Sequence, residues 1–271
     1  MSALTTSRLR AAEMFDAAVP LVLVGIGMLH PRPLVWLCCL GVAFAALAAP
    51  VLGGAGLMHV LSLKTGTRIQ GPRRAPPLIA REAFETSRAM FVAATLAAWP
   101  LARWWLGHPT GMVWDLAPLG VSKTRMVVMM LLGVVGMDAW LYWKHRLLHT
   151  RLLFSFHKGH HHFRDPTAFA GFAVGPVESV MTFWPILLLC FPWAVHWAPM
   201  YIGLVVGFVT LNFYLHCGVT YRWIDATLPK VGLNTSAFHN VHHSHANANF
   251  GEAMFVWDVI CKTRLSDRER V

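Results

Sequence analysis

Long apolar runs without charged residues are the feature that most limits how this chain can fold. About 20 consecutive apolar residues suffice to cross a bilayer as a helix. The runs are continuously apolar rather than alternating, so they predict helices and not the strands of a membrane barrel. The first run is short and fits a retained span better than a cleaved signal peptide. The runs lie at residues 17–30, 34–60, 88–106, 125–143, 179–198 and 200–218.

Composition agrees with a membrane protein. The chain has 271 residues, of which 56% are hydrophobic and 13% charged, and its mean hydropathy is +0.49. A soluble domain carries about 25% charged residues. We therefore expect an all-α, polytopic membrane bundle of about four to six transmembrane helices. The net charge of +10 comes from cations clustered between the apolar runs, a pattern typical of cytoplasmic loops and not of a nucleic-acid-binding surface.

The loop between the second and third runs predicts the orientation. Cytoplasmic loops are enriched in Lys and Arg, so this loop is expected in the cytoplasm. Counting runs outward from it places both termini, segment 144–178 and segment 219–271 on the same side. We expect one membrane domain, 1–271, in which 1–124 holds the N-terminal spans and the basic loop. The basic residues of the loop are Lys64, Arg68, Arg73, Arg74, Arg81 and Arg88.

Three spaced histidine clusters indicate a metal site. One pair is four residues apart, and two triplets have the spacing i, i+3, i+4, which on a helix places each set on one side. Neutral imidazole suits iron, zinc or copper, and two metal ions would use about this many nitrogens. The sequence therefore predicts a site for two metals in a cytoplasmic, histidine-rich helical cap. The predicted ligands are His145, His149, His157, His160, His161, His239, His242 and His243.

Other residues are candidates for the same site. His216, at the end of the last apolar run, is a further expected ligand, and His162 and His245 are weaker ones. Histidine ligands need acidic partners that fix their tautomers and balance the metal charge. The candidate carboxylates are Asp138, Glu178 and Asp258. The five cysteines have no disulfide spacing and are expected to be free thiols.

Taken together and in order, several motifs between Asp138 and Arg264 resemble the fatty acid hydroxylase / sterol desaturase superfamily of integral-membrane di-iron enzymes. They are "DAWLYWKHRLLH", "FHKGHHHFRDPTAF" followed by "GPVE", "LHCGV", "FHNVHHSHANANFG" and "WDVICKTR". The resemblance implies that the eight cluster histidines and His216 hold two iron ions, and that 125–271 is the catalytic region. Asn249 and Gly251 match an "N-x-G" motif, and Trp257 and Asp258 match "WD". Two positions depart from the family pattern: Gly175 stands where many members have His, and Cys261-Lys262-Thr263 stands where many have Phe-Gly-Thr.

The resemblance implies an O2-dependent oxidoreductase that hydroxylates a C–H bond of a fatty acyl, sterol or related lipid. Desaturation by the same site is the alternative. It also implies a separate electron donor, a ferredoxin or cytochrome b5 with its reductase. Zinc can occupy such ligands as well. A membrane metal transporter is the alternative of another class, but it should place ligands at mid-membrane depth, whereas these histidines gather at the ends of apolar runs.

Overall fold

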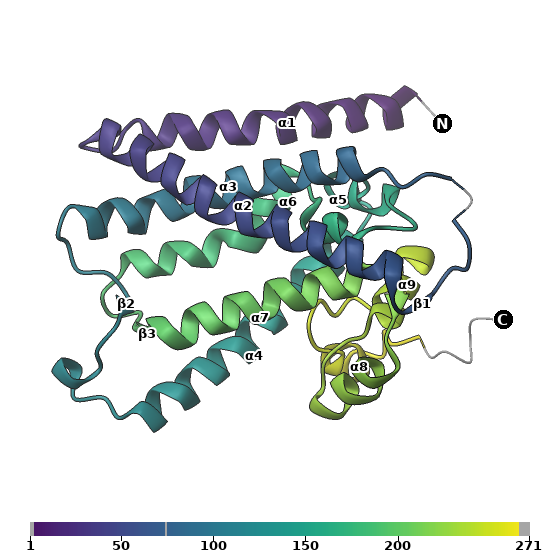
Figure 1. Ribbon diagram of the computed structural model, residues 1–271. Helices are drawn as coiled ribbons and strands as arrows, with labels where there is room; N and C mark the ends of the chain where they lie inside the picture. Colours follow the sequence, from purple (N-terminus) through teal and green to yellow (C-terminus); the bar gives the residue numbers. More distant parts are fainter. Residues whose placement is uncertain (1–2, 74, 266–271) are drawn as a thin grey trace. The chain divides into compact units, whose positions relative to one another are not determined.

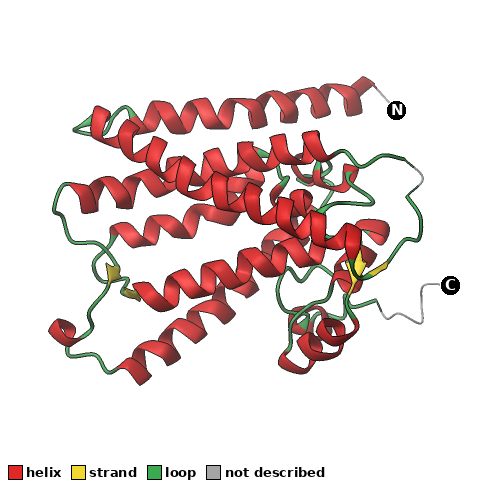
Figure 2. Cartoon of the chain, viewed as in Figure 1, coloured by secondary structure: helices red, strands yellow, loops and turns green. Residues whose placement is uncertain are grey.

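Helices make up most of the computed structural model, which describes residues 3–73 and 75–265 (Figures 1 and 2). Arg74 of the basic loop lies outside the described residues. The strands are only two residues long each (Figure 2). In chain order the elements are α1 (Ala3–Gly27), α2 (Pro33–Lys64), β1 (Thr67–Arg68), α3 (Ile79–Trp105), β2 (Met112–Val113), η1 (Ala117–Leu119), α4 (Lys123–Leu148), α5 (Phe154–His157), η2 (His160–His162), η3 (Ala168–Phe172), α6 (Pro176–Phe183), η4 (Trp184–Cys190), β3 (His196–Trp197), α7 (Ala198–His216), β4 (Val219–Thr220), α8 (Arg222–Thr227), η5 (Leu228–Val231), α9 (Ser236–His245) and α10 (Val256–Ile260), where η marks a 3-10 helix.

Four helices in the described part of the chain are long and apolar enough to cross a membrane. The first is the stretch Arg10–Met28, which covers most of α1 and the residue after it. The other three are the whole of α2, α4 and α7. Their apolar side chains are widely exposed; Leu57, Leu132 and Val206 are 63%, 61% and 59% exposed. Apolar surface of this extent is not stable in water and fits a lipid environment. These observations confirm the predicted all-α membrane fold class.

Two of the predicted spans differ from the structure. Run 88–106 lies in α3, whose charged residues keep it out of the set of four apolar helices. Run 179–198 is not one helix: α6 ends at Phe183, and the 3-10 helix η4 follows with Pro185 near its start. Proline lacks the N–H that would continue the α-helical hydrogen bonds, which explains the break.

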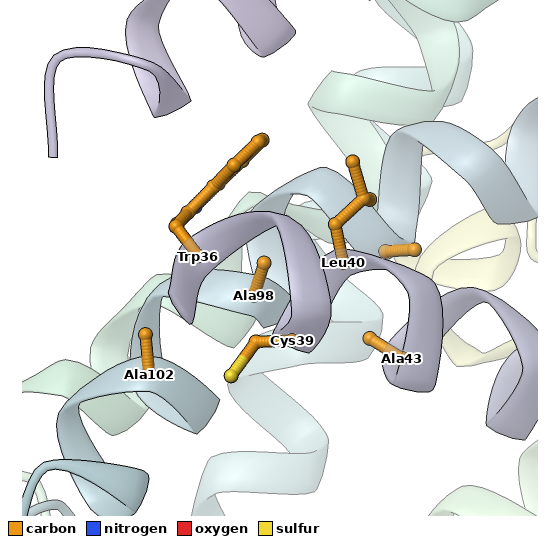
Figure 3. Close-up of a cluster of buried hydrophobic side chains, with 7 residues drawn as sticks. Trp36, Cys39, Leu40, Ala43, Ala98 and Ala102 are labelled. Atoms are coloured by element: carbon orange, nitrogen blue, oxygen red, sulfur yellow. The ribbon is translucent and has the colours of Figure 1, made fainter. Parts of the chain in front are cut away.

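The chain divides into two compact units, and four of its helices contribute residues to both. Unit 1 comprises 1–50, 88–136 and 175–207. Its core packs α2 against α3 through Trp36, Cys39, Leu40 and Ala43 on one side and three small residues on the other (Figure 3). Gly27 ends α1 beside the Trp36 ring, where a Cβ would lie 2.2 Å from the indole. The small residues of α3 are Ala94, Ala98 and Ala102.

Unit 2 comprises 51–87, 137–174 and 208–271 and contains every predicted metal ligand. The C-terminal ends of α2, α4 and α7 belong to it, as does the N-terminal end of α3. Just after α2 and α7, strands β1 and β4 pair antiparallel, with Thr67 opposite Thr220. The unit thus collects the ends of the long helices together with the short elements α5, η2, α8, α9 and α10.

Candidate metal centre

The predicted ligands come from four segments of unit 2. His145 lies in the last turn of α4 and His149 directly follows that helix, while His216 is the last residue of α7. Segment 157–161 is the end of α5 and the start of η2, rather than one continuous helix. Thr235 caps α9 by accepting a hydrogen bond from Phe238 N at 3.2 Å, and a threonine at this position stabilises the first turn of a helix. That helix then carries the last three ligands, His239, His242 and His243.

The first group contains five histidines from three of these segments. Their nearest ring nitrogens all lie within 4.8 Å of one another. His161 Nε2 lies 3.1 Å from the Nε2 atoms of His149, His157 and His242. His145 Nε2 lies 3.1 Å from His157 Nε2. The group is His145, His149, His157, His161 and His242.

The second group contains four histidines, all of them buried. Their ligand atoms again lie within 4.8 Å of one another. His239 Nε2 lies 2.9 Å from His216 Nε2 and 3.2 Å from His243 Nε2. His216 therefore joins a metal-type cluster, as its position at the end of the last apolar run predicts. The group is His160, His216, His239 and His243.

Each histidine triplet is divided between the two groups. In both triplets the i and i+4 residues share a group, and the i+3 residue belongs to the other. The expectation that a whole triplet converges on one site is therefore too simple. The two groups are neighbours, since the ring centroids of His161 and His243 are 5.2 Å apart and those of His157 and His160 are 5.3 Å apart. The two adjacent groups could each hold a metal ion.

The nitrogen spacing fits metal ions at both centres. Two imidazole nitrogens about 2.1 Å from one ion and at right angles lie about 3.0 Å apart, and the Nε2 pairs here lie 2.9–3.2 Å apart. Buried Nδ1 atoms of His160, His239 and His243 have no hydrogen-bond partner among the described residues. Where Nδ1 donates to a carbonyl, as in His216 and His242, Nε2 presents a buried lone pair to the neighbouring rings. A cation would give that lone pair the partner that buried polar atoms normally have.

The buried imidazoles of α9 and η2 are neutral, which a metal ligand must be. Burial and the neighbouring histidines lower the pKa of His160, His239, His242 and His243 well below the ordinary value. A neutral ring carries one N–H and one lone pair. The set is therefore ready to bind a soft or borderline cation without first losing protons.

Backbone carbonyls orient three of the ligands. His145 Nδ1 donates to Phe250 O at 2.8 Å, His216 Nδ1 to Asn212 O at 2.9 Å and His242 Nδ1 to Ala248 O at 2.8 Å. Each bond fixes the tautomer and leaves Nε2 with its lone pair toward the group. These acceptors had no signal in the sequence, because any residue has a backbone carbonyl.

Asp258 supports one of these carbonyls. Its carboxylate accepts hydrogen bonds from Phe250 N at 2.8 Å, Gly251 N at 2.7 Å and Thr263 Oγ1 at 2.7 Å. Phe250 in turn receives the Nδ1–H of His145. Asp258 therefore acts on the first group through the Phe250 backbone. Burial raises the pKa of Asp258, and these three hydrogen bonds oppose the shift.

The other two candidate carboxylates have different surroundings. Asp138 accepts hydrogen bonds from Ala253 N, Met254 N and, at 2.8 Å, Trp257 Nε1, so it anchors the segment that follows Phe250. Among the described residues no hydrogen bond joins Asp138 to a histidine. Glu178 is buried in unit 1, in the first turn of α6.

A carboxylate that the sequence analysis missed lies beside the first group. Glu252 Oε1 forms a 2.6 Å ion pair with the buried Lys144 and lies 4.0 Å from His145 Nδ1. It supplies negative charge close to the ligands, and Lys144 holds it in place. Its position next to Gly251 in the "N-x-G" segment was the only available signal.

A strap formed by residues 67–73 holds the histidine segments together. Arg68 Nη2 donates to both carboxylate oxygens of Asp165 at 2.6 Å, and Arg68 Nη1 donates to Gly218 O at 3.3 Å. Arg73 donates to the backbone carbonyl of Asp165 at 2.7 Å. Gln70 Nε2 reaches Arg164 O at 2.7 Å and Asn240 Oδ1 at 3.2 Å. The strap thus contacts the chain just after η2, just after α7 and inside α9.

The two weaker histidine candidates lie outside both groups. His162 is exposed and packs against Phe163, at 6.0 Å between ring centroids. His245 is exposed at the end of α9. Both are exposed, whereas the histidines next to them in the two groups are buried or half-buried.

Known proteins resemble this chain in the region that contains the histidine groups. A family model described as fatty acid hydroxylase matches residues 130–263, a range that contains all nine clustered histidines. The chain is 29% identical to lathosterol oxidase of Rattus norvegicus over 172 residues, which are 58% of this chain and 55% of that protein. It is 34% identical to a probable Delta(7)-sterol 5(6)-desaturase of Neurospora crassa over 132 residues, 47% of this chain and 35% of that protein.

Residues 130–263 of the chain are a region of the fatty acid hydroxylase / sterol desaturase superfamily. This membership confirms the resemblance seen in the motifs. The chain spans about half the length of the curated relatives it matches. No solved structure matches the chain.

The superfamily motif "N-x-G" has a clear structural purpose here. Asn249 is fully buried and adopts a left-handed backbone, with φ of 58°, a conformation that asparagine tolerates. Its side chain bonds Phe238 O at 3.1 Å and Leu265 N at 2.8 Å. Gly251 has no room for a side chain, because a Cβ would lie 2.3 Å from Met254 O. The motif thus builds the turn that presents Phe250 O to His145.

The two departures from the superfamily pattern are also explained. At Gly175 a Cβ would lie 2.7 Å from Asp16 Oδ2, and Asp16 Oδ1 accepts the hydrogen bond of Val177 N at 2.8 Å. The carboxylate of α1 thus caps the start of α6. Lys262 stands where many members carry glycine and has a φ of 55°, a left-handed backbone that glycine adopts without strain.

Proposed function

We propose that the chain is a membrane-bound, di-iron, O2-dependent oxidoreductase that hydroxylates a C–H bond of a lipid-like substrate. The observation that carries this proposal is the pair of adjacent histidine groups, five residues and four residues, within the matched region. When bound there, iron supplies the activation of O2. Superfamily membership weighs against the alternative of a metal transporter.

The protein's own residues would hold and orient the metals. The first group would hold one ion and the second group the other. His145, His216 and His242 donate Nδ1–H to backbone carbonyls, which leaves Nε2 of each ring free to bind a metal ion. The negative charge of Glu252 lies near the first group and would offset part of the metal charge. Asp258 stiffens the Phe250 turn behind His145. Burial of these ligands excludes water, which protects a reactive oxidant from side reactions.

Desaturation of a sterol-like lipid is the second candidate. Two kinds of relative are named lathosterol oxidase and Delta(7)-sterol 5(6)-desaturase, and those names favour it. Both reactions begin at an unactivated C–H bond and use the same metal site. The difference is whether the substrate gains an oxygen atom or loses two hydrogen atoms.

The metal site is proposed to face the cytoplasm. The basic strap, the histidine segments and the ends of α2, α4 and α7 all belong to unit 2, and positive loops prefer the cytoplasmic side. The chain leaves this unit in α3 and returns to it in α4. If α4 crosses the bilayer, α3 must cross it as well, despite its charged first turns.

Metal analysis with group-specific variants tests the proposal. We expect two iron ions per wild-type chain, and a loss of metal from His242→Ala in the first group and His160→Ala in the second. The exposed neighbour His162→Ala is the matched control and should keep both ions. Unchanged metal content in His160→Ala and His242→Ala would contradict the site.

Lipid analysis of a host that expresses the protein tests the reaction. An O2-dependent product with one added oxygen atom supports hydroxylation. A product that lacks two hydrogen atoms moves the conclusion to desaturation. The oxidoreductase proposal is overturned if the host shows no altered lipid and the purified protein with both ions bound, reduced by dithionite, freed of excess dithionite and then given O2 and host lipids, also forms no product.

A further inference from the structure

Outside the metal centre, unit 2 has a cavity of about 610 Å³ beside the first turn of α9. Its walls come from β4, α8, η5, the start of α9 and the stretch that follows α10. All of these segments belong to unit 2. None of the cavity's lining residues is a predicted metal ligand.

The charge of this cavity is positive. Arg222 and Arg264 line it together with Asp225. The Asp225 carboxylate already accepts hydrogen bonds from Tyr214 Oη at 2.6 Å and Tyr221 N at 2.7 Å. Among the described residues neither arginine forms a salt bridge with a carboxylate. The Arg264 guanidinium lies over the Phe255 ring at 4.7 Å, which holds its charge at the cavity wall.

The rim has the residue types of a protein-binding surface. Trp223 and Val231, from the same α8 and η5 that line the cavity, are 71% and 67% exposed. Tryptophan and arginine dominate the energy of protein–protein interfaces. An exposed tryptophan next to Arg222, on a helix that lines the positive cavity, therefore suits a partner with an acidic surface.

The cavity also reaches the helix that carries the second histidine group. Thr235, Ala237 and Phe238 line it, and His239 is the next residue along α9. His239 Nε2 lies 2.9 Å from His216 Nε2 within the group. The cavity wall and one ligand of the second group, His239, thus belong to the first turn of α9.

We propose that this cavity and its rim are the docking site of an acidic, one-electron donor protein. The inference rests on the proposed function. Hydroxylation of one C–H bond with O2 consumes two electrons and two protons and releases the second oxygen atom as water. A one-electron donor must therefore dock twice per turnover, and docking at the first turn of α9 brings it next to a ligand of the second group.

Binding measurements test the docking site. The probes are two acidic proteins, the soluble haem domain of cytochrome b5 and a plant-type ferredoxin, and the full chain is held in phosphatidylcholine nanodiscs. At least one probe should bind with an affinity that falls with salt. Arg222→Glu and Arg264→Gln together should weaken its Kd by about tenfold or more, as loss of complementary charge does.

Arg81→Glu is the matched control, because Arg81 is an exposed arginine on the first turn of α3, in the same unit. It should leave the Kd within about twofold. Thermal unfolding of each variant checks that the fold is intact. The proposal is overturned if neither probe binds, if the double variant binds as wild type, or if the control weakens binding equally. It is also overturned if the double variant alters retention of phosphatidylserine and not donor binding, which would indicate a lipid headgroup site.

Turnover with dithionite separates this inference from the proposed function. Reduction by dithionite under anaerobic conditions needs no docking site. After the excess dithionite is removed and O2 is added, the double variant should complete a single turnover like wild type, whereas it should turn over more slowly with the protein donor. Failure of wild type with dithionite would count against the proposed reaction. The donor Kd would still decide the docking site.

Discussion

A histidine ligand presents one ring nitrogen to the metal, so its other nitrogen needs a partner. In His145, His216 and His242 that partner is a backbone carbonyl. The expected partners were side-chain carboxylates, and Asp258 fulfils this role only through the Phe250 backbone. The orientation of these rings therefore depends on the position of backbone carbonyls. For His145 that carbonyl belongs to Phe250, in a turn shaped by Asn249, Gly251 and Asp258.

The variant Asp258→Asn tests this indirect role. Asparagine keeps one acceptor oxygen, but its NH2 group replaces the other oxygen. That NH2 group cannot accept the N–H or O–H hydrogen bond that the lost oxygen accepts in the wild type. One buried donor loses its partner, which costs about 1–3 kcal/mol. We expect a lower unfolding temperature and reduced metal content in the group that contains His145. Asp115→Asn, at an exposed turn in unit 1, is the control and should change neither quantity.

The backbone conformation of Lys262 leads to a second prediction, on the stability of the fold. Its left-handed backbone, with φ of 55°, is unfavourable for a residue with a Cβ. Lys262→Gly should therefore stabilise the fold by about 0.5–1 kcal/mol, measured as a higher unfolding temperature. Lys262→Ala keeps the Cβ and should give no gain. Equal gains from both variants would point to the lost charge instead.

At the scale of elements, the division of each triplet follows from helix geometry. Residues i and i+4 lie nearly one above the other, whereas i+3 is rotated to the other side of the stripe. Two metals placed side by side can therefore share one turn of helix. In the 157–161 segment the chain changes from α5 to the 3-10 helix η2, and the same division persists.

The strap formed by residues 67–73 is the element whose role the sequence analysis did not anticipate. Its arginines were expected to mark the cytoplasmic face, and Arg68 and Arg73 in addition bind Asp165 and its neighbours. Hydrogen bonds between an arginine and a carboxylate are stronger than those between neutral groups. The strap ties together segments that carry ligands of both groups.

We predict that Arg68→Ala loses metal and stability. The half-buried Asp165 would lose its charged hydrogen bonds, at a cost of about 1.5–3 kcal/mol. Arg68→Lys keeps the charge but has a single nitrogen in place of the two that bind Asp165 and the Gly218 carbonyl, so it should retain an intermediate metal content at the same temperature. Arg81→Ala, on an exposed position of α3, serves as the control. Wild-type metal content in Arg68→Ala would show that the strap has no part in holding the site.

At the scale of the whole molecule, the long apolar helices set the topology. Four of them have the length and composition of spans, and α3 must accompany α4 if the chain is to return to unit 2. The interrupted segment α6–η4 begins and ends within unit 1. If α7 crosses the bilayer to bring the chain back to unit 2, α6–η4 must cross it as well, and an even number of crossings then separates the strap from each histidine segment.

Cysteine labelling in membranes tests this topology. In a variant without the five native cysteines, His162→Cys and Lys230→Cys should react with an impermeant reagent only from the cytoplasmic side. His108→Cys, in the exposed turn after α3, should react only from the opposite side. Reaction of all three from one side would refute the proposed crossings of α3 and α4.

Much of the fold class and of the candidate ligand set could be predicted from sequence. Long apolar runs have few foldable states in a bilayer, and histidine spacing reports which rings can share a site. Helix breaks were harder, as run 179–198 shows, because Pro185 interrupts a segment of high hydropathy. The single-domain organisation and the iron identity stay predictions.

The sequence by itself determined that this is a helical membrane protein with three histidine motifs of metal-binding spacing. Only the tertiary structure decided which histidines belong to which group, that His216 joins the second one, and that carbonyls and the strap position the ligands. The physical reason is the separation along the chain of the residues that interact. Hydropathy and helical spacing act within one segment, whereas the division into two groups and the partners of each ring depend on contacts between residues as far apart as His161 and His242.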